Sequence, residues 1–156
     1  MNDQAIEQEI QAKGLTAPRV TPQDLAANIV NEVYFTARDG VIGEAFDSGL
    51  IDEPDGVGEH PALRLLTFCV LVLRNGFTVT GESACASPEN FDAEIGQQIA
   101  RKNAIEKIWP LMGYQLREHL HRRAVFDAEP KTSDEAISQA RAPSDRSAYA
   151  QPYYPG

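Results

Sequence analysis

The sequence has no excess of basic side chains, no paired cysteine motif and no long hydrophobic run. Its 23 acidic and 14 basic side chains give a net charge of −9, so we expect no general affinity for nucleic acid or anionic lipid. The two cysteines, Cys69 and Cys85, form no CxxC pair, and we expect both thiols to stay reduced. The longest apolar run, 65–73, is too short to span a membrane as a helix.

Signals of targeting and of catalysis are missing as well. The first residues contain neither the basic region nor the apolar run of a signal or transit peptide. No nucleophile elbow, Walker loop or dinucleotide fingerprint occurs, and His119 and His121 would lie on different faces of a helix. We therefore expect a soluble, cytoplasmic protein that does not bind membranes, is not an enzyme, and holds no cofactor and no metal ion.

The excess of acidic charge lies in one part of the chain. Residues 22–60 hold nine acidic side chains and one basic side chain, whereas residues 61–123 hold six acidic and eight basic ones. The sequence therefore predicts a molecule with one strongly acidic surface and one weakly basic surface.

Residues 22–38 are predicted to form a helix. Thr21, Pro22 and Asp24 have the pattern of an N-cap, a first-turn proline and a capping box. Apolar side chains then recur four residues apart, which is typical of one packed helix face. The following residues 43–61 are acidic and rich in glycine and proline, and they are predicted to form a loop.

Residues 66–82 are predicted to form an antiparallel hairpin. Asn75-Gly76 between two β-branched runs indicates a type I′ turn, which would pair Leu73 with Thr78 and Leu71 with Thr80. One face would carry Phe68, Val70, Val72, Phe77 and Val79, and the other Cys69, Leu71 and Leu73. Because both faces are apolar, we expect helices or further copies of the chain to cover them.

A second helix is predicted from residue 88 to residue 109, with Ser87 as its N-cap. Pro110 should break or kink it, and the apolar pattern continues to about residue 123. The expected fold is a small single α+β domain, a two-stranded hairpin packed with two main helices, the second kinked at a proline. The core domain would span 21–123, after an N-terminal segment 1–20 with a possible short helix, and before an extended or disordered tail 124–156.

Basic and polar side chains on the second helix and beside the hairpin turn form a candidate site for a small anion. Guanidinium and ammonium groups near free backbone donors are the chemistry that holds a phosphate. The alternative is a solvated helix face, the more common meaning of such a pattern. The candidate residues are Arg74, Ser87, Arg101, Lys102, Asn103 and Lys107. Nearby, Trp109 and Tyr114 are expected to pack in the core rather than to stack on a base.

The acidic loop is a candidate surface for binding another protein. Its acidic side chains do not have the spacing of a helix–loop–helix calcium site, so we interpret it as a solvated loop. The candidate residues are Asp47, Asp52, Glu53, Asp55 and Glu59.

Three stretches together resemble a tailed-phage protein family named jointly after accessory genes of a coliphage and a Shigella phage. The first is 66–85 with the hairpin, and the second has two parts, 90–96 (Asn-Phe-Asp-Ala-Glu-Ile-Gly) and 99–104 (Ile-Ala-Arg-Lys-Asn-Ala). The third is 108–114 (Ile-Trp-Pro-Leu-Met-Gly-Tyr). The similarity extends from about Thr21 to Leu120. It implies a phage or prophage origin and expression inside a bacterium, and it transfers no catalytic residue.

These observations favour a phage accessory protein that acts in the bacterial cytoplasm by binding. We expect a homo-oligomer whose partner is a host or phage protein, in host takeover or counter-defence. The alternatives are sequestration of a small anionic metabolite such as a signalling nucleotide, and a minor component of the virion.

Overall fold

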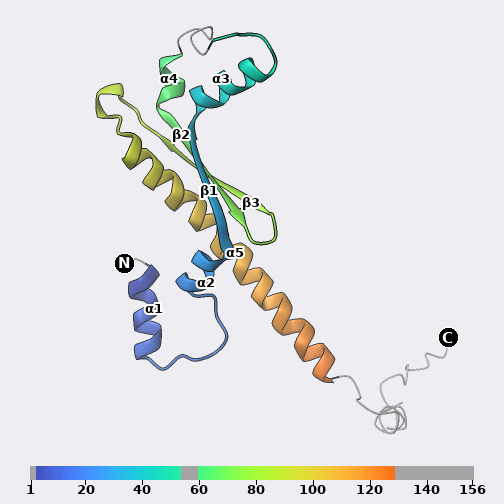
Figure 1. Ribbon diagram of the computed structural model, residues 1–156. Coiled ribbons are helices and arrows are strands. Elements are labelled where there is room, and N and C mark those ends of the chain that lie inside the picture. The colour runs from blue at the N-terminus through green and yellow to red at the C-terminus, as the bar shows by residue number, and fades with distance from the viewer. Residues whose placement is uncertain (1–2, 54–59, 129–156) are drawn as a thin grey trace, which may run out of the picture. The chain divides into compact units, whose positions relative to one another are not determined.

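The computed structural model describes residues 3–53 and 60–128 (Figure 1). Most of the tail predicted over 124–156 therefore lies outside the described residues. The chain divides into two units, Met1–Arg117 and Glu118–Gly156. The described part of the second unit is helical and carries two ion pairs along its surface, Arg122 with Glu118 and Arg123 with Asp127. Apart from the end of the last helix, all features below belong to the first unit.

The first unit opens with a short helix, α1 (Asp3–Ala12), within the N-terminal segment 1–20. Glu7 on α1 is almost fully buried, and its carboxylate accepts hydrogen bonds from Gln11 and from Arg19 in the following segment. These bonds hold the pKa of Glu7 below its usual value, with the bond from Arg19 as the main cause. The ion pair ties the segment before α2 (Pro22–Asn28) back to α1.

The helix predicted over 22–38 is wrong beyond its first two turns. The capping box of Thr21 and Asp24 is present, with the Asp24 amide donating to Thr21 Oγ1 at 3.1 Å. The helix α2 ends at Asn28, however, and Ile29–Thr36 forms strand β1. β1 is rich in β-branched and aromatic residues, and it pairs with β2 (Leu66–Leu73), with one shift of register between Ile29 and Asn31. That pairing with a distant strand outweighs the helical spacing.

A second capping box then starts a helix where the first was expected to end. Thr36 Oγ1 accepts from the Asp39 amide at 3.2 Å, and α3 (Ala37–Asp47) follows. The loop predicted over 43–61 is therefore helical in its first five residues. The short helix α4 (Pro61–Arg64) then leads into β2.

The hairpin of β2 and β3 (Thr78–Ala84) is present, but its register differs from the prediction by one residue. Only Gly76 of the turn has a positive φ, of 83°, so a type I′ turn over Asn75-Gly76 is wrong. The turn holds three residues, because the Leu73 amide donates to the Phe77 carbonyl at 2.8 Å. Leu71 thus lies opposite Val79 rather than Thr80, which moves Val79 to the other face.

The long helix α5 (Ala93–Ala128) covers one face of the sheet with residues of the first unit. Its predicted start at residue 88, with Ser87 as the N-cap, is wrong: Pro88–Asn90 is a 3₁₀ turn, and Ser87 makes no capping bond. Asp92 caps α5 instead, because its Oδ1 accepts from the Ile95 amide at 2.9 Å. The helix continues through Pro110, which lies on the exposed side.

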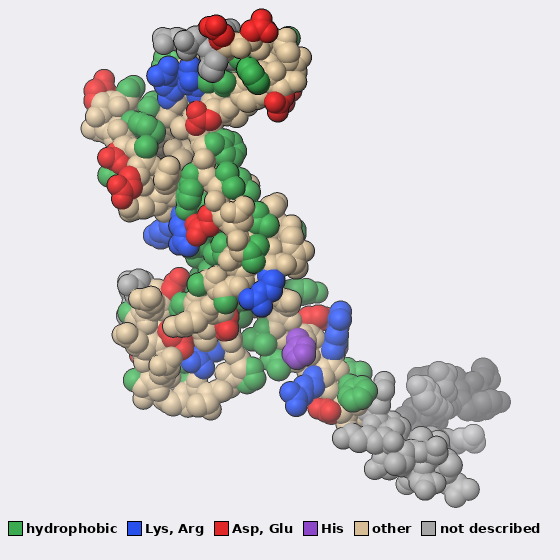
Figure 2. All heavy atoms as spheres, viewed as in Figure 1, with side chains coloured by type: hydrophobic (Ala, Val, Ile, Leu, Met, Phe, Trp, Pro, Cys, Tyr) green, Lys and Arg blue, Asp and Glu red, His purple; other side chains and the backbone are tan. Residues whose placement is uncertain are grey.

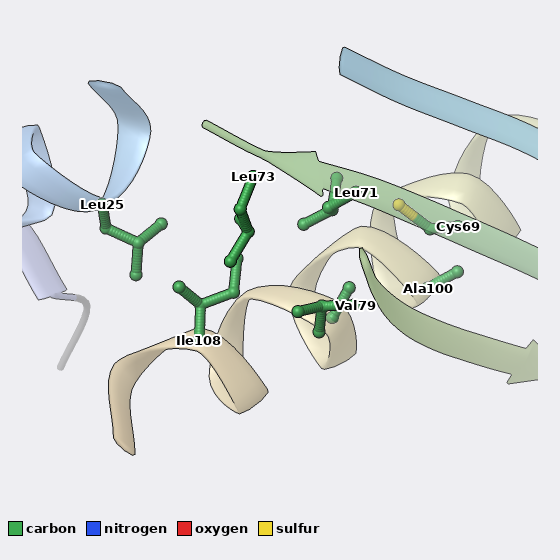
Figure 3. Packing of buried hydrophobic residues seen from close by; sticks show 8 residues of the cluster. Leu25, Cys69, Leu71, Leu73, Val79, Ala100 and Ile108 are labelled. Atoms are coloured by element: carbon green, nitrogen blue, oxygen red, sulfur yellow. The ribbon is translucent and has the colours of Figure 1, made fainter. Parts of the chain in front are cut away.

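The core lies between α5 and a three-stranded antiparallel sheet (Figure 3). The strand order in this sheet is β1-β2-β3. α5 approaches closely because its buried positions recur every four residues and most are small; they are Gly96, Ala100, Ala104 and Ile108. Against them pack alternate residues of the hairpin and one leucine of α2; these are Cys69, Leu71, Leu73, Val79 and Leu25. The α+β class is confirmed, with three strands in place of the predicted two.

Candidate interaction surface

The face of the sheet that α5 does not cover is apolar, and we call it the outer face. It comprises Val33 and Phe35 of β1 with Phe68, Val70 and Val72 of β2. Val33 is 46% exposed, and the other four are half-buried. The rings of Phe35 and Phe68 stack with centroids 5.4 Å apart. In Figure 2 hydrophobic side chains run along the middle of the view, over the strands.

The outer face is almost free of charge. β3 contributes the exposed residues Thr78, Thr80 and Glu82 to it, opposite Val72, Val70 and Phe68 respectively. Glu82 is thus its one carboxylate, at the margin, and lies 3.6 Å from the ammonium group of Lys107. A contiguous apolar sheet face with few charges is typical of a surface that another protein covers.

Two side chains of α5 occupy the free edge of β3. The Lys107 ammonium group donates to the Thr80 carbonyl at 2.7 Å, and the Asn103 amide donates to the Glu82 carbonyl at 2.8 Å. Both carbonyls face away from β2, because residues 80 and 82 alternate with the residues that bond to β2. Asn103 and Lys107 therefore have a structural use as donors to a strand edge.

A polar group of side chains lies beside β1, on the side that faces α5. Arg101 donates to both carboxylate oxygens of Glu32, at 2.7 and 3.1 Å, and the Tyr34 hydroxyl donates to Glu32 Oε2 at 2.8 Å. The bidentate bond from Arg101 holds the pKa of Glu32 below its usual value. Burial, followed by the bond to Glu32, raises the pKa of Tyr34 well above its usual value. This group therefore keeps its charges paired at neutral pH.

The six residues of the predicted anion site do not come together. Arg101 is paired with Glu32 beside β1, whereas Asn103 and Lys107 lie at the β3 edge. Arg74 donates to the Ala27 carbonyl at 2.8 Å, far along the sheet. Lys102 is exposed and lies 3.9 Å from Glu106, and Ser87 precedes the 3₁₀ turn. The sequence thus identified cations that mostly bind to the protein's own acceptors.

Arg101 and Lys102 do share one hollow, of about 600 Å³, along the side of α5. It is lined by Asp3, Gln98, Arg101, Lys102, Ile105, Glu106 and Trp109. The hollow combines two cations with two acids. Trp109 is half-buried against the core, as expected, whereas the expectation for Tyr114 is wrong, because its side chain is 74% exposed.

The acidic candidates are only partly described. Asp47 ends α3, and Asp52 and Glu53 follow it; all three are exposed. Asp55 and Glu59 lie outside the described residues. Acidic side chains are visible around α3 in Figure 2.

Both cysteines are free, as predicted, with Cys69 buried and Cys85 half-buried. Burial raises the pKa of the Cys69 thiol. Within residues 3–53 and 60–128 we find no group of three or more side chains suited to hold a metal ion. Over the same residues, no helix combines the length and apolar character needed to cross a bilayer.

Sequence reasoning missed β1, and with it Val33, Phe35 and the Glu32–Tyr34 pair. A signal was available in the run Ile29–Thr36, where four of eight residues are β-branched and two are aromatic. That signal competed with the i, i+4 spacing of Leu25, Ile29 and Val33.

Comparison with known protein families matches residues 20–120 to the family described as "Phage protein (N4 Gp49/phage Sf6 gene 66) family". The match includes α2, the whole sheet and most of α5. No curated protein and no solved structure matches the chain.

Proposed function

The chain belongs to this phage protein family, and from that premise we propose that it acts inside the bacterial host by binding proteins, as a homo-oligomer and without catalysis. The observation that carries the proposal is the uncovered outer face. The described residues form one sheet, and α5 covers one of its faces. On the other face α3 packs against Phe35 at one end of β1, and apolar side chains such as the 46% exposed Val33 stay partly open to solvent in one chain. Buried apolar area is the main driving force for association.

A second copy of the chain is the occupant that the charges favour. The chain carries a net charge of −9, so two copies repel each other over most of their surfaces. The outer face brings a single carboxylate, Glu82, and Lys107 lies beside it. Apolar contact can therefore form there without bringing many like charges together.

The described acidic candidates Asp47, Asp52 and Glu53, which we call the acidic segment, would then remain outside the self-association surface and serve to bind a partner. Asp47, Asp52 and Glu53 are exposed, and none of them belongs to the sheet. Such a surface suits a host or phage protein with a basic face, since opposite charges speed encounter and orient the complex.

Light scattering coupled to size-exclusion chromatography tests the self-association. We expect the unaltered protein to have the mass of an oligomer at micromolar concentration. Val70→Lys, at the centre of the outer face, should shift the mass downward. Leu50→Lys is the matched control, because Leu50 is 79% exposed and lies outside the sheet. A monomeric unaltered protein, or equal masses for both variants, contradicts the proposal.

Affinity capture from infected cells tests the acidic segment. With Asp47, Asp52 and Glu53 replaced by their amides, the chain should no longer capture a protein that the unaltered chain captures. The control variant Glu89→Gln, which changes an exposed acid outside the segment, should still capture it. Equal capture by both variants contradicts the assignment of the acidic segment.

A second candidate function is sequestration of a small anion such as a nucleotide. The observation that favours it is the shared hollow, where Arg101, Lys102 and Trp109 meet. Trp109 is the sole tryptophan, so its fluorescence reports binding directly. Quenching by one member of a nucleotide panel, abolished in Lys102→Ala, would support sequestration; no quenching contradicts it.

A further inference from the structure

The two edges of the sheet differ in how their outward backbone groups are bonded. At the β3 edge, the outward carbonyls of Thr80 and Glu82 accept from Lys107 and Asn103. At the β1 edge, the alternation of the ladder turns the backbone of Glu32 and Tyr34 outward. Among the described residues, no hydrogen bond reaches the Tyr34 amide, the Tyr34 carbonyl or the Glu32 carbonyl. The Glu32 amide has only a local bond, to Asn31 Oδ1 at 2.9 Å.

An eight-residue strand with such an edge is a template for another extended chain. We propose that β1 pairs antiparallel with β1 of a second copy, about a two-fold axis at Val33, so that two sheets become one of six strands. This interface is separate from the outer-face contact proposed above, because it lies in the plane of the sheet.

The register follows from three neighbouring positions on β1. An axis at Glu32 would place Glu32 directly opposite its own copy, and like charges in that position are destabilising. An axis at Tyr34 would pair Glu32 with Thr36, whose amide already donates to Asp39 Oδ2 at 2.8 Å. An axis at Val33 avoids both conflicts.

With the axis at Val33, each Glu32 lies opposite Tyr34 of the other copy, and the two residues exchange both backbone hydrogen bonds. The Glu32 amide exchanges its local bond to Asn31 for one to the Tyr34 carbonyl. The two Val33 side chains meet on the outer face, in a position without backbone bonds between them. The carboxylate of Glu32 lies opposite a hydroxyl-bearing ring, and the charge of Glu32 stays paired with Arg101.

Disulfide trapping tests this register. In antiparallel pairs without backbone bonds the Cα atoms lie roughly 4.5 Å apart, which is within the range that a disulfide spans. Val33→Cys, in a Cys85→Ser background, should therefore form a covalent dimer under mild oxidation; Cys69 is buried. Asn31→Cys is the matched control, because Asn31 is exposed on the same strand and face. In the proposed register the two copies of residue 31 are offset by about four residues along the paired strands, too far apart for a disulfide.

A mixture of two different cysteine variants makes the test specific for the proposed register. Asn31→Cys mixed with Phe35→Cys should cross-link, because these positions are opposite each other in the proposed register. Failure of Val33→Cys to cross-link faster than Asn31→Cys overturns the proposal.

Repeating the experiment in Val70→Lys separates the two interfaces. A Val33 cross-link that persists in that variant supports edge pairing independently of the outer face. A cross-link lost with Val70→Lys assigns the contact to the outer face and overturns edge pairing. Oligomers that resist Val70→Lys yet give no Val33 cross-link count against both interfaces.

Discussion

Gly81 of β3 lies against the backbone of Ala104 on α5 so closely that no side-chain carbon fits between them. A Cβ at Gly81 would also meet the Ala100 carbonyl oxygen, and neither backbone atom can move without shifting the helix. The strand and the helix are therefore held at a separation that glycine alone permits.

Gly81→Ala should destabilise the fold by about 3 kcal/mol or more, at the upper end of the cost of overpacking, since the obstacle is backbone. Urea unfolding followed by circular dichroism measures the change. Gly113→Ala is the control, because a Cβ there meets nothing within 4 Å. That variant should gain about 0.5–1 kcal/mol from helix propensity. Equal stabilities for both variants would refute the close approach.

Ile108 is the largest fully buried side chain of α5. Ile108→Ala should cost about 2–5 kcal/mol, because it removes apolar contact and leaves a cavity. Leu111→Ala, on the same helix but 43% exposed, should cost much less. Thermal unfolding of both variants checks the difference, and a similar cost for both would contradict the packing of α5 on the sheet.

Thr36 ends β1 and caps α3, so a change there tests the second capping box. Thr36→Ala should lose about 1 kcal/mol, because the first amides of α3 lose an acceptor. Thr36→Ser keeps a hydroxyl and should retain most of that stability. Chemical denaturation of the two variants measures both effects. Equal losses would show that the hydroxyl does not cap the helix.

The bond between Glu32 and Arg101 predicts a dependence on pH. The folded pKa of Glu32 lies below the unfolded value, so its stabilisation is complete above the unfolded pKa, about 4.3, and is lost as the pH falls through the folded value. Glu32→Gln should therefore be less stable than the unaltered protein at pH 7, by less than about 1 kcal/mol for this partly exposed pair. The difference should be smaller at pH 3, where more of the carboxylate is protonated.

Urea unfolding at the two pH values measures this effect. Glu44→Gln serves as the control, since Glu44 is exposed on α3 and its carboxylate makes no hydrogen bond or ion pair with the described residues. A constant difference between Glu32→Gln and the unaltered protein at both pH values would contradict the assignment.

Removing the donors at the β3 edge should promote aggregation. The double variant Asn103→Ala, Lys107→Ala leaves the Thr80 and Glu82 carbonyls exposed for pairing with another strand. Static light scattering over time should show growing particles for this variant. Lys102→Ala, on the outward side of the same helix, is expected to leave the scattering unchanged. Scattering by the double variant equal to that of Lys102→Ala would contradict this use of Asn103 and Lys107.

The features predicted correctly from the sequence are those set by neighbouring residues. Thr21 and Asp24 cap α2 because the capping box is local, and the hairpin forms because its two strands are adjacent in the chain. The identity of Ile29–Thr36 depends on β2, more than thirty residues later, and no local pattern contains that partner. The predicted hairpin register was wrong because Asn75-Gly76 is compatible with a two-residue and with a three-residue turn, and the packing of Val79 on α5 selects the second.

The candidate site was predictable in part. The sequence correctly indicated a hairpin with apolar side chains on both faces, and α5 covers only one of them. It gave no means to foresee that Arg101, Asn103 and Lys107 each have an acceptor within the fold. Those acceptors are a carboxylate and carbonyls of strands that are distant in sequence, so their positions depend on the completed sheet.

The bonded edge of β3 has a consequence for the size of any assembly built by strand pairing. A sheet with two open edges can add copies without end, as fibrils do. Here Asn103 and Lys107 occupy one edge, and a two-fold pairing at Val33 would use the other. Growth through strand edges would then stop at a closed pair of chains. The helix α5 would thus limit the size of the assembly through Asn103 and Lys107, in addition to packing in the core.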